Sequence, residues 1–201
     1  SYPLTQPTTL DAELNGRVAT VQSGAQVILR DLILANGQTS GYGGAIHNSG
    51  ALTLTHSTVS GSAAEYGGGV YHNAGTLHVE RCTLNDNSAQ YNGGALYHFS
   101  GSTRILESTI HGNAARTGGG VATHSGTAYI VKSTLNGNTA GEYGGGVYNH
   151  GDSPYMAESV AQLQVLNSTL SGNSANRGGA LCNQGMANLI HSTVVSNTAG
   201  A

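Results

Sequence analysis

The sequence predicts an all-β fold, a parallel β-helix of about seven rungs with about 25 residues in each. Three observations predict it. Glycine doublets or triplets followed by a small residue and an aliphatic residue recur six times, a Ser-Thr-aliphatic motif recurs in step with them, and a polar column follows that motif at constant offset. The aliphatic residues that end the glycine motifs are Ile46, Val70, Leu96, Val121, Val147 and Leu181. A period of this kind is typical of a solenoid whose repeats contact only their neighbours.

Each repeat has the pattern of short strands with an inner and an outer face. In residues 75–92, alternation of period two is broken only by a register shift at Glu80 and Arg81. The residues predicted to point inward are Leu77, Val79, Cys82, Leu84 and Asn87. Glycine tolerates positive φ and close backbone approach, so the glycine motifs are expected at the corners. The same strand of successive rungs is then expected to pair in parallel and in register.

The polar column that follows the Ser-Thr motif is mostly Asn, with Ser62 in one repeat. Stacked Asn side chains can hydrogen-bond along a solenoid axis and also satisfy corner backbone groups. We expect a structural ladder formed by Asn36, Asn87, Asn113, Asn138, Asn173 and Asn197.

The repeat pattern resembles known bacterial repeats. Gly-Gly-Ala-Ile at residues 43–46 and Leu-x-x-Asn at residues 84–87 resemble the GGAI and FxxN repeats of polymorphic outer membrane proteins. They are also similar to the glycine-rich β-helix repeats of large secreted bacterial surface proteins. The resemblance covers roughly residues 28–201, although Val, Leu or Ile replaces the Phe throughout. It implies an extracellular, right-handed parallel β-helix.

Composition and charge limit the partners and the location. A net charge of −3 with only seven Lys and Arg residues leaves no basic stripe, so no nucleic acid partner is expected. No apolar run has the length of a membrane-spanning helix, so membrane insertion is not expected either. The chain opens at Ser1 without a Met or an apolar leader, which predicts a secreted product, extracellular or at the cell surface after signal removal.

The domain prediction is a tail or inter-subunit segment at residues 1–17, followed by the β-helix at 18–201. One repeat is lengthened by an insertion at residues 150–160. Insertions in repeat proteins emerge as loops and often make contacts. The candidate contact residues in this loop are Asp152, Pro154, Tyr155 and Met156.

The titratable residues do not form a recognisable reactive cluster. The acidic residues are scattered, so we predict no enzyme activity, no catalytic residues, no metal and no cofactor; a polysaccharide-active enzyme is the weaker alternative. His72 and His98 are expected to stack about 4.8 Å apart on adjacent rungs, as part of a polar ladder rather than a zinc site. Cys82 and Cys182 lie four repeats apart and are expected to be free thiols.

Tyrosines form two partial aromatic ladders on the predicted surface. They can bind sugars, cover a seam against another subunit, or simply stabilise an exposed sheet. The residues before the glycines are Tyr42, Tyr66, Tyr91 and Tyr143, and those after the aliphatic residue are Tyr71, Tyr97 and Tyr148.

The sequence shows no terminal cap and stops just before the next expected glycine corner. Open ends are unpaired sheet edges. We therefore expect a non-enzymatic structural protein whose subunits stack head to tail into a surface or matrix filament, with the missing half-rung supplied by the next subunit. The alternative is a monomeric cell-surface adhesin whose partners are glycans or a cell surface.

Overall fold

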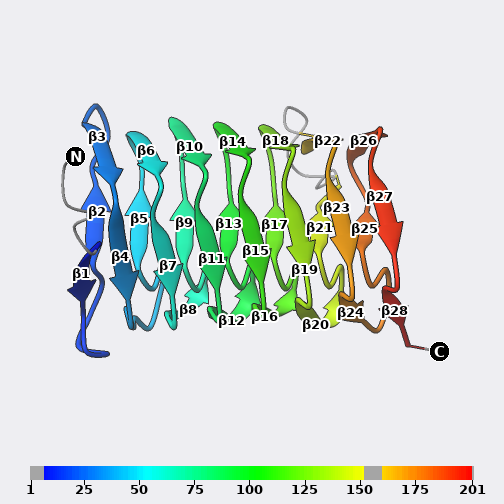
Figure 1. The fold of residues 1–201 in the computed structure, drawn as a ribbon, viewed down its shortest axis with the longest axis horizontal. Coiled ribbons are helices and arrows are strands. Elements are labelled where there is room, and N and C mark those ends of the chain that lie inside the picture. The colour runs from blue at the N-terminus through cyan, green and yellow to red at the C-terminus, as the bar shows by residue number, and fades with distance from the viewer. Residues whose placement is uncertain (1–6, 152–159, 201) are drawn as a thin grey trace, which may run out of the picture.

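The computed structural model describes residues 7–151 and 160–200. In these residues the chain coils around one axis and forms four parallel sheets, here called A, B, C and D. Figure 1 shows the strands stacked along the long axis, with the N-terminal rungs at one end and the C-terminal rungs at the other. The predicted parallel β-helix of about seven turns is confirmed.

Sheet A begins with the first described strand, and sheet B contains the strands that follow the glycine corners. Sheet A consists of β1 (Thr8–Asp11), β4 (Leu32–Ala35), β7 (Thr58–Ser60), β11 (Thr83–Asn85), β15 (Thr109–His111), β19 (Thr134–Asn136), β23 (Thr169–Ser171) and β27 (Thr193–Val195). Sheet B consists of β2 (Ala19–Val21), β5 (Ile46–Asn48), β9 (Val70–His72), β13 (Leu96–His98), β17 (Val121–Thr123), β21 (Val147–Asn149) and β25 (Leu181–Asn183).

Sheets C and D complete each rung. Sheet C consists of β3 (Gln26–Arg30), β6 (Ala51–Thr55), β10 (Thr76–Glu80), β14 (Ser102–Leu106), β18 (Thr127–Val131), β22 (Gln162–Leu166) and β26 (Met186–Ile190). Sheet D consists of β8 (Ala63–Tyr66), β12 (Ser88–Asn92), β16 (Ala114–Thr117), β20 (Thr139–Tyr143), β24 (Ser174–Ala175) and β28 (Thr198–Ala199). A full rung therefore passes through B, C, A and D in turn.

The core is a narrow column of stacked aliphatic side chains. Val79 in β10 lies opposite Leu54 in β6 and Ile105 in β14, and all three are at most 1% exposed. The five residues of the 75–92 repeat that were predicted to point inward are all buried. Small and branched side chains fill this interior because each rung supplies only a few inward positions.

The register shift predicted at Glu80 and Arg81 is a left-handed corner between sheets C and A. Arg81 has a φ of 52°. Every rung has a non-glycine residue with φ between 49° and 55° at this corner, and these residues are Asp31, His56, Arg81, Glu107, Lys132, Asn167 and His191. Such residues flip the side-chain alternation, so both flanking strands keep their aliphatic residues inside.

The solenoid begins earlier than the predicted boundary at Val18. Strand β1 pairs in parallel with β4, with Thr8 opposite Leu32. This register places Pro7 at the corner position occupied by Asp31, whose φ is 55°. The proline ring holds φ near −65°, so the standard corner cannot continue ahead of Thr8.

The prediction that the last rung is half complete is wrong. Strands β25, β26, β27 and β28 supply one strand to each of the four sheets. The half-rung lies instead at the other end, where β1 of sheet A precedes the first described strands of sheets B and C. The predicted contact residues Asp152, Pro154, Tyr155 and Met156 lie outside the described residues.

The second glycine of each glycine motif is required by close packing between rungs. A Cβ atom on Gly94 would lie 2.3 Å from the carbonyl oxygen of Gly119 and 2.6 Å from that of Ala114. We expect Gly94→Ala to destabilise the protein by about 2–3 kcal/mol, because the neighbouring backbone must move. Equilibrium unfolding in urea measures this loss.

Gly120→Ala is the matched control. A Cβ atom there would lie 2.7 Å from the carbonyl oxygen of Gly146, but the same column already holds alanine at Ala45, Ala95 and Ala180, so the backbone can accommodate it. This change is expected to stay within about 1 kcal/mol. Equal losses for the two variants would contradict the steric explanation.

Candidate functional site

The most regular polar feature is an Asn ladder inside the corner between sheets A and D. The Oδ1 atom of Asn113 accepts from the backbone N and the Nδ2 of Asn87, at 3.0 and 3.1 Å. The Nδ2 of Asn113 donates to Oδ1 of Asn138 at 2.9 Å and to the carbonyl of Leu84 at 3.0 Å. The same pattern continues through Asn173 to Asn197. The ladder satisfies corner backbone groups that would otherwise be buried without partners.

Asn36 was predicted to belong to this ladder, and that placement is wrong. Gly37 takes the ladder position, since its backbone N donates to Oγ of Ser62. Asn36 lies one residue earlier, at a left-handed corner with a φ of 54°, and its Nδ2 donates to the carboxylate of Asp11 at 3.0 and 3.1 Å. Asn tolerates this conformation better than most residues, so the sequence alone did not distinguish the two positions.

A second polar column is buried at the end of the sheet B strands. The rings of His72 and His98 stack with centroids 5.3 Å apart and an interplanar angle of 22°. His72 Nδ1 lies 2.9 Å from the Asn48 amide, and His98 Nδ1 lies 2.9 Å from Oγ1 of Thr103. Both Nε2 atoms are buried without a hydrogen-bond partner among the described residues.

Burial strongly disfavours the charged form of both imidazoles. Desolvation lowers the pKa of His72 to about 4, and desolvation together with the neighbouring His72 lowers the pKa of His98 to about 3. Among the residues that the structure describes, no group of three or more His, Cys, Asp or Glu could hold a metal ion. The stacked pair therefore lies in the polar column as two neutral rings.

The tyrosines that follow the aliphatic residue, here called the inner tyrosine ladder, lie on the face of sheet B that points away from the core. Tyr71 and Tyr97 are in register on β9 and β13, with ring centroids 5.6 Å apart. Tyr148 belongs to the same column but is separated from them by Ala122. All three tyrosines are at most 7% exposed, because the outer tyrosines cover them.

The outer tyrosine ladder differs from the prediction in one rung. Tyr42 and Tyr66 are in register and stack with centroids 5.4 Å apart. A register irregularity in β12 then places Asn92, and not Tyr91, opposite Tyr66. Tyr91 still packs on Tyr66, with centroids 5.1 Å apart. Tyr143 continues the column only after Thr117.

These two ladders form part of a groove, here called the aromatic groove, with a volume of about 340 Å³. Its lining residues are Tyr42, Tyr66, Tyr71, Asn92, Tyr97, Phe99, His124 and His150. Burial raises the pKa of Tyr97 to about 12 and raises that of Tyr71 as well, so both phenols stay protonated. The groove thus combines aromatic faces with neutral hydrogen-bonding groups.

One wall of this groove, formed by three aromatic rings, was not predicted from the sequence. Phe99, His124 and His150 each follow directly after the buried polar column of sheet B. Phe99 and His124 stack with centroids 4.9 Å apart at 9°, and His124 and His150 lie 4.8 Å apart. The constant offset of these rings from the glycine motifs was the available signal.

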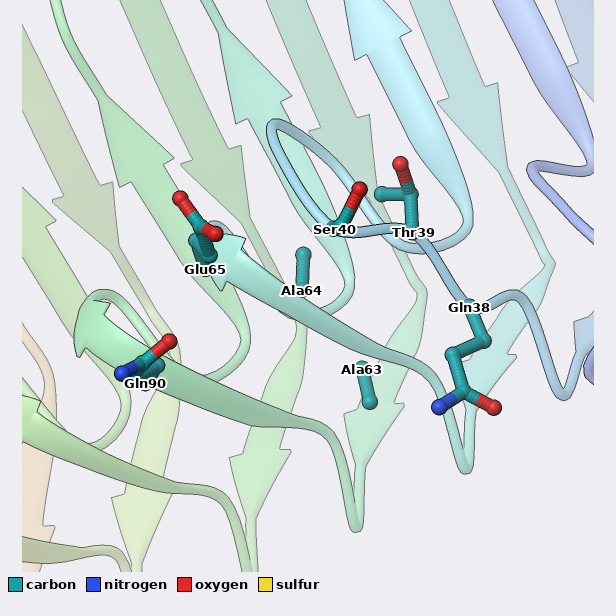
Figure 2. Close-up of a pocket in the computed structure, with 7 residues that line it drawn as sticks. All are labelled: Gln38, Thr39, Ser40, Ala63, Ala64, Glu65 and Gln90. Carbon is teal, nitrogen blue, oxygen red and sulfur yellow. The ribbon is translucent and has the colours of Figure 1, made fainter.

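A second hollow lies over sheet D and encloses about 270 Å³. Figure 2 shows its lining side chains, which are Gln38, Thr39, Ser40, Ala63, Ala64, Glu65 and Gln90. Glu65 supplies the single carboxylate of this lining. Glycoside hydrolysis uses a pair of carboxylates, so this hollow does not match that chemistry.

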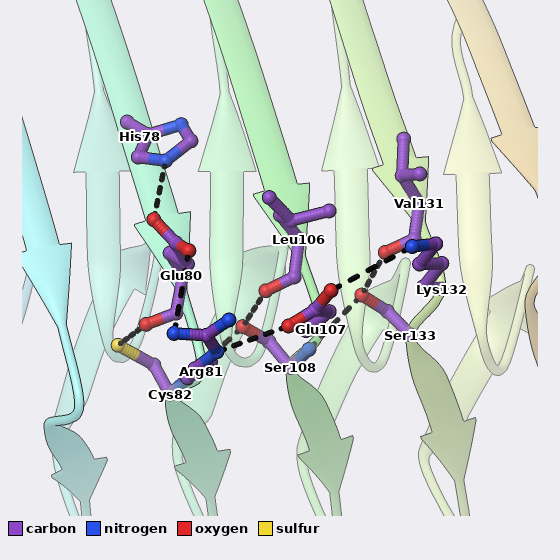
Figure 3. A network of polar contacts seen from close by, with 10 residues as sticks. All are labelled: His78, Glu80, Arg81, Cys82, Leu106, Glu107, Ser108, Val131, Lys132 and Ser133. Carbon is purple, nitrogen blue, oxygen red and sulfur yellow. Dashed lines mark hydrogen bonds and ion pairs between the residues drawn. The ribbon is translucent and has the colours of Figure 1, made fainter.

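The charged residues of the C to A corner pair with one another across rungs (Figure 3). Arg81 Nε donates to Glu107 at 3.0 Å, and Lys132 Nζ lies 3.8 Å from the same carboxylate. His78 lies 3.3 Å from Glu80. The Arg81 and Lys132 contacts to Glu107 join neighbouring rungs and so align them. Because all these pairs are partly exposed, each contributes little to stability.

The two cysteines are free thiols, as predicted. Cys82 is buried and its Sγ contacts the carbonyl of Glu80. Burial raises the pKa of both thiols, which keeps them protonated. No helix in the described residues is long and apolar enough to cross a membrane.

Comparison with known proteins identifies the repeat. Residues 81–98 and 167–184 match the Chlamydia polymorphic membrane protein repeat. Each stretch contains a ladder Asn, Asn87 or Asn173, and the Gly-Gly-Ala-Leu corner that follows it. Neither a curated protein nor a solved structure matches the chain. The chain is therefore a parallel β-solenoid with repeats similar to those of the Chlamydia polymorphic membrane proteins, which confirms the resemblance predicted from its glycine and Asn motifs.

Proposed function

We propose that the chain is a non-enzymatic structural β-solenoid, located at a cell surface or in an extracellular matrix, that lengthens by stacking with further copies head to tail. The observation that carries this proposal is that the same core columns are open at both ends. Leu10 in β1 is 39% exposed and Val194 in β27 is 50% exposed, whereas Leu84 in the same column is fully buried. Leu189 in β26 is 41% exposed in the column of the buried Val165.

Placing β1 of a second copy on β27 would bury the Leu10 and Val194 side chains against each other, whereas Leu189 would be covered only by a further strand in sheet C. Fully burying a Val or Leu side chain contributes about 1.5–3 kcal/mol, so several half-exposed residues favour association. The contact is heterologous, since the C-terminal edge of one copy meets the N-terminal edge of the next, and such contacts build filaments when they do not close.

The register of the end rungs defines the junction. Placing β1 of one copy on β27 of another continues sheet A. Because β1 precedes β2 and β3 by half a rung, those strands then lie two strand spacings from β25 and β26. The junction thus has room for one further strand in sheet B and one in sheet C. Residues 8–11 belong to the segment 1–17 for which an inter-subunit role is predicted, and as β1 they would make the sheet A contact at this junction.

Two further observations support a structural role at a surface. Glu80, Glu107 and Glu142 all pair with basic side chains of the same or a neighbouring rung, so these carboxylates serve to align rungs. The matched repeat comes from proteins described as membrane proteins of Chlamydia. That similarity supports a surface location.

Sedimentation velocity and negative-stain electron microscopy over a range of protein concentrations test the proposal. We expect rods whose lengths increase by about 38 Å with each added copy, since each copy contributes eight strands to sheet A at about 4.8 Å per strand. Val194→Asp is expected to abolish the longer species, because it places a charge in the stacking core column.

Ile28→Asp is the matched control. Ile28 is 70% exposed and lies opposite the outward-facing Thr53 of β6, so this change should leave assembly intact. Rods of a single copy at every protein concentration would contradict the proposal, and so would an equal loss of assembly in both variants.

A further inference from the structure

We infer that the aromatic groove is a binding site for a neutral, linear carbohydrate chain that lies along the solenoid axis. This binding function goes beyond the proposed structural role and does not depend on it. The groove is built by side chains of successive rungs, so it runs along the axis and suits a linear ligand.

The floor and walls of the groove present aromatic rings. Tyr71 and Tyr97 form a floor that is only 6% exposed, and Tyr66 packs against Tyr97 with ring centroids 5.9 Å apart at 27°. The accessible tyrosine faces are those of Tyr42, which is 47% exposed, and of the partly buried Tyr66. Phe99 and His124 form the stacked pair of the opposite wall. Sugar rings present C–H groups on one face and hydroxyls at their edges, and aromatic rings with polar tips complement both.

Burial disfavours charge on three polar side chains of the lining. Burial keeps the Tyr71 and Tyr97 phenols protonated and lowers the pKa of His124. Asn92 adds an amide that can both donate and accept. None of the lining residues is Asp, Glu, Lys or Arg. This chemistry favours a neutral polyhydroxylated ligand over an anionic or cationic one.

The dimensions favour a chain over a single sugar. The lining extends from Tyr42, ahead of β5, to His150, after β21. These strands are four rungs apart in sheet B, which corresponds to about 19 Å at about 4.8 Å per rung. A ligand that fills the groove therefore contacts several rungs at once.

An extended peptide fits this surface less well. Peptides commonly add to a free sheet edge through backbone hydrogen bonds. Strands β9 and β13 below the groove are paired on both sides, with β5 and β17 as their outer neighbours. The groove offers side-chain faces and no free backbone edge.

The experiment is calorimetric titration with cellohexaose and chitohexaose as neutral probes and an oligogalacturonate of equal length as the anionic probe. It is carried out in the Val194→Asp variant, so that end-to-end association does not affect the result. We expect at least one neutral hexamer to bind with a Kd of about 1 mM or tighter, and the anionic probe to bind at least about tenfold more weakly.

Tyr66→Ala is expected to weaken binding by about tenfold, since a lost aromatic stacking contact amounts to roughly one factor of ten in affinity. Tyr66→Phe keeps the ring and should retain binding, which separates stacking from misfolding. Tyr129→Ala is the matched control, because Tyr129 lies half-buried on β18 in sheet C, away from the groove.

Three results would overturn the inference. One is the absence of binding by both neutral hexamers, the second is equal or tighter binding of the oligogalacturonate, and the third is equal weakening by Tyr66→Ala and Tyr129→Ala. None of these results bears on the filament proposal, which is read from particle length.

Discussion

The protein is expected to lose much of its stability when the pH is lowered from 7 to 4. The stacked His72 and His98 are buried as neutral rings, with pKa values lowered to about 4 and about 3 from 6.5. Each unit of pKa difference corresponds to about 1.4 kcal/mol. Together the two residues are expected to lower the free energy of unfolding by several kcal/mol between pH 7 and pH 4.

The direction follows from proton linkage. The pKa values of both imidazoles are lower in the folded state than the usual 6.5, so the unfolded chain binds more protons below that pH. The stability is complete above pH 6.5 and is lost as the pH falls through 6.5 towards 4 and 3. Urea denaturation midpoints measured by circular dichroism at pH 7, 6, 5 and 4 record this loss.

A double variant, His72→Asn with His98→Asn, separates these residues from the other titrating groups. Asn occupies the same column at Asn48 and Asn149, so the fold accommodates it. We expect this variant to flatten the pH dependence between 6.5 and 4. His111→Asn, on the outer face of β15, should leave the dependence as in the parent. An unchanged slope in the double variant would contradict the explanation.

Asn113→Ala is expected to destabilise the protein by about 3–4 kcal/mol. The substitution removes the acceptor for two donors of Asn87 and the donor to Asn138, all in the interior. Each buried group left unpaired costs about 1–3 kcal/mol. For a chain of this size the melting temperature should fall by about 10 °C.

Differential scanning calorimetry of Asn113→Ala beside Asn136→Ala measures this effect. Asn136 is exposed on β19, so its substitution should change stability by no more than about 0.5 kcal/mol. Asn113→Ser should fall between the two, because Ser62 already serves in the ladder column. A melting temperature for Asn113→Ala equal to that of Asn136→Ala would show that the ladder is dispensable.

The ladder and the core were predictable because every rung repeats the same local rule. Once the strands pair in parallel and in register, Asn87 must lie beside Asn113, and Val79 beside Ile105. The degenerate first repeat did not follow the rule. Asn36 and Gly37 are adjacent, and the sequence does not show which of them lies at the left-handed corner, because both residues tolerate positive φ.

The aromatic groove was only partly predictable. The tyrosine ladders were visible as columns, but the register irregularity in β12 moved Asn92 into the place expected for Tyr91. Only the structure shows that Phe99 and His124 line the same groove as Tyr42 and Tyr66. These contacts depend on how the corners fold, which short-range patterns do not specify.

The sequence by itself determined the solenoid, its period, its inward columns and its free thiols, because these depend on alternation and on identical neighbours one rung away. Only the tertiary structure decided that residues 8–11 already pair in sheet A, how the described end rungs relate by half a rung and which rings meet across the groove. Those features join residues of different columns and different sheets. Their positions depend on the backbone conformation at all the corners of a rung together, which a short stretch of sequence does not specify.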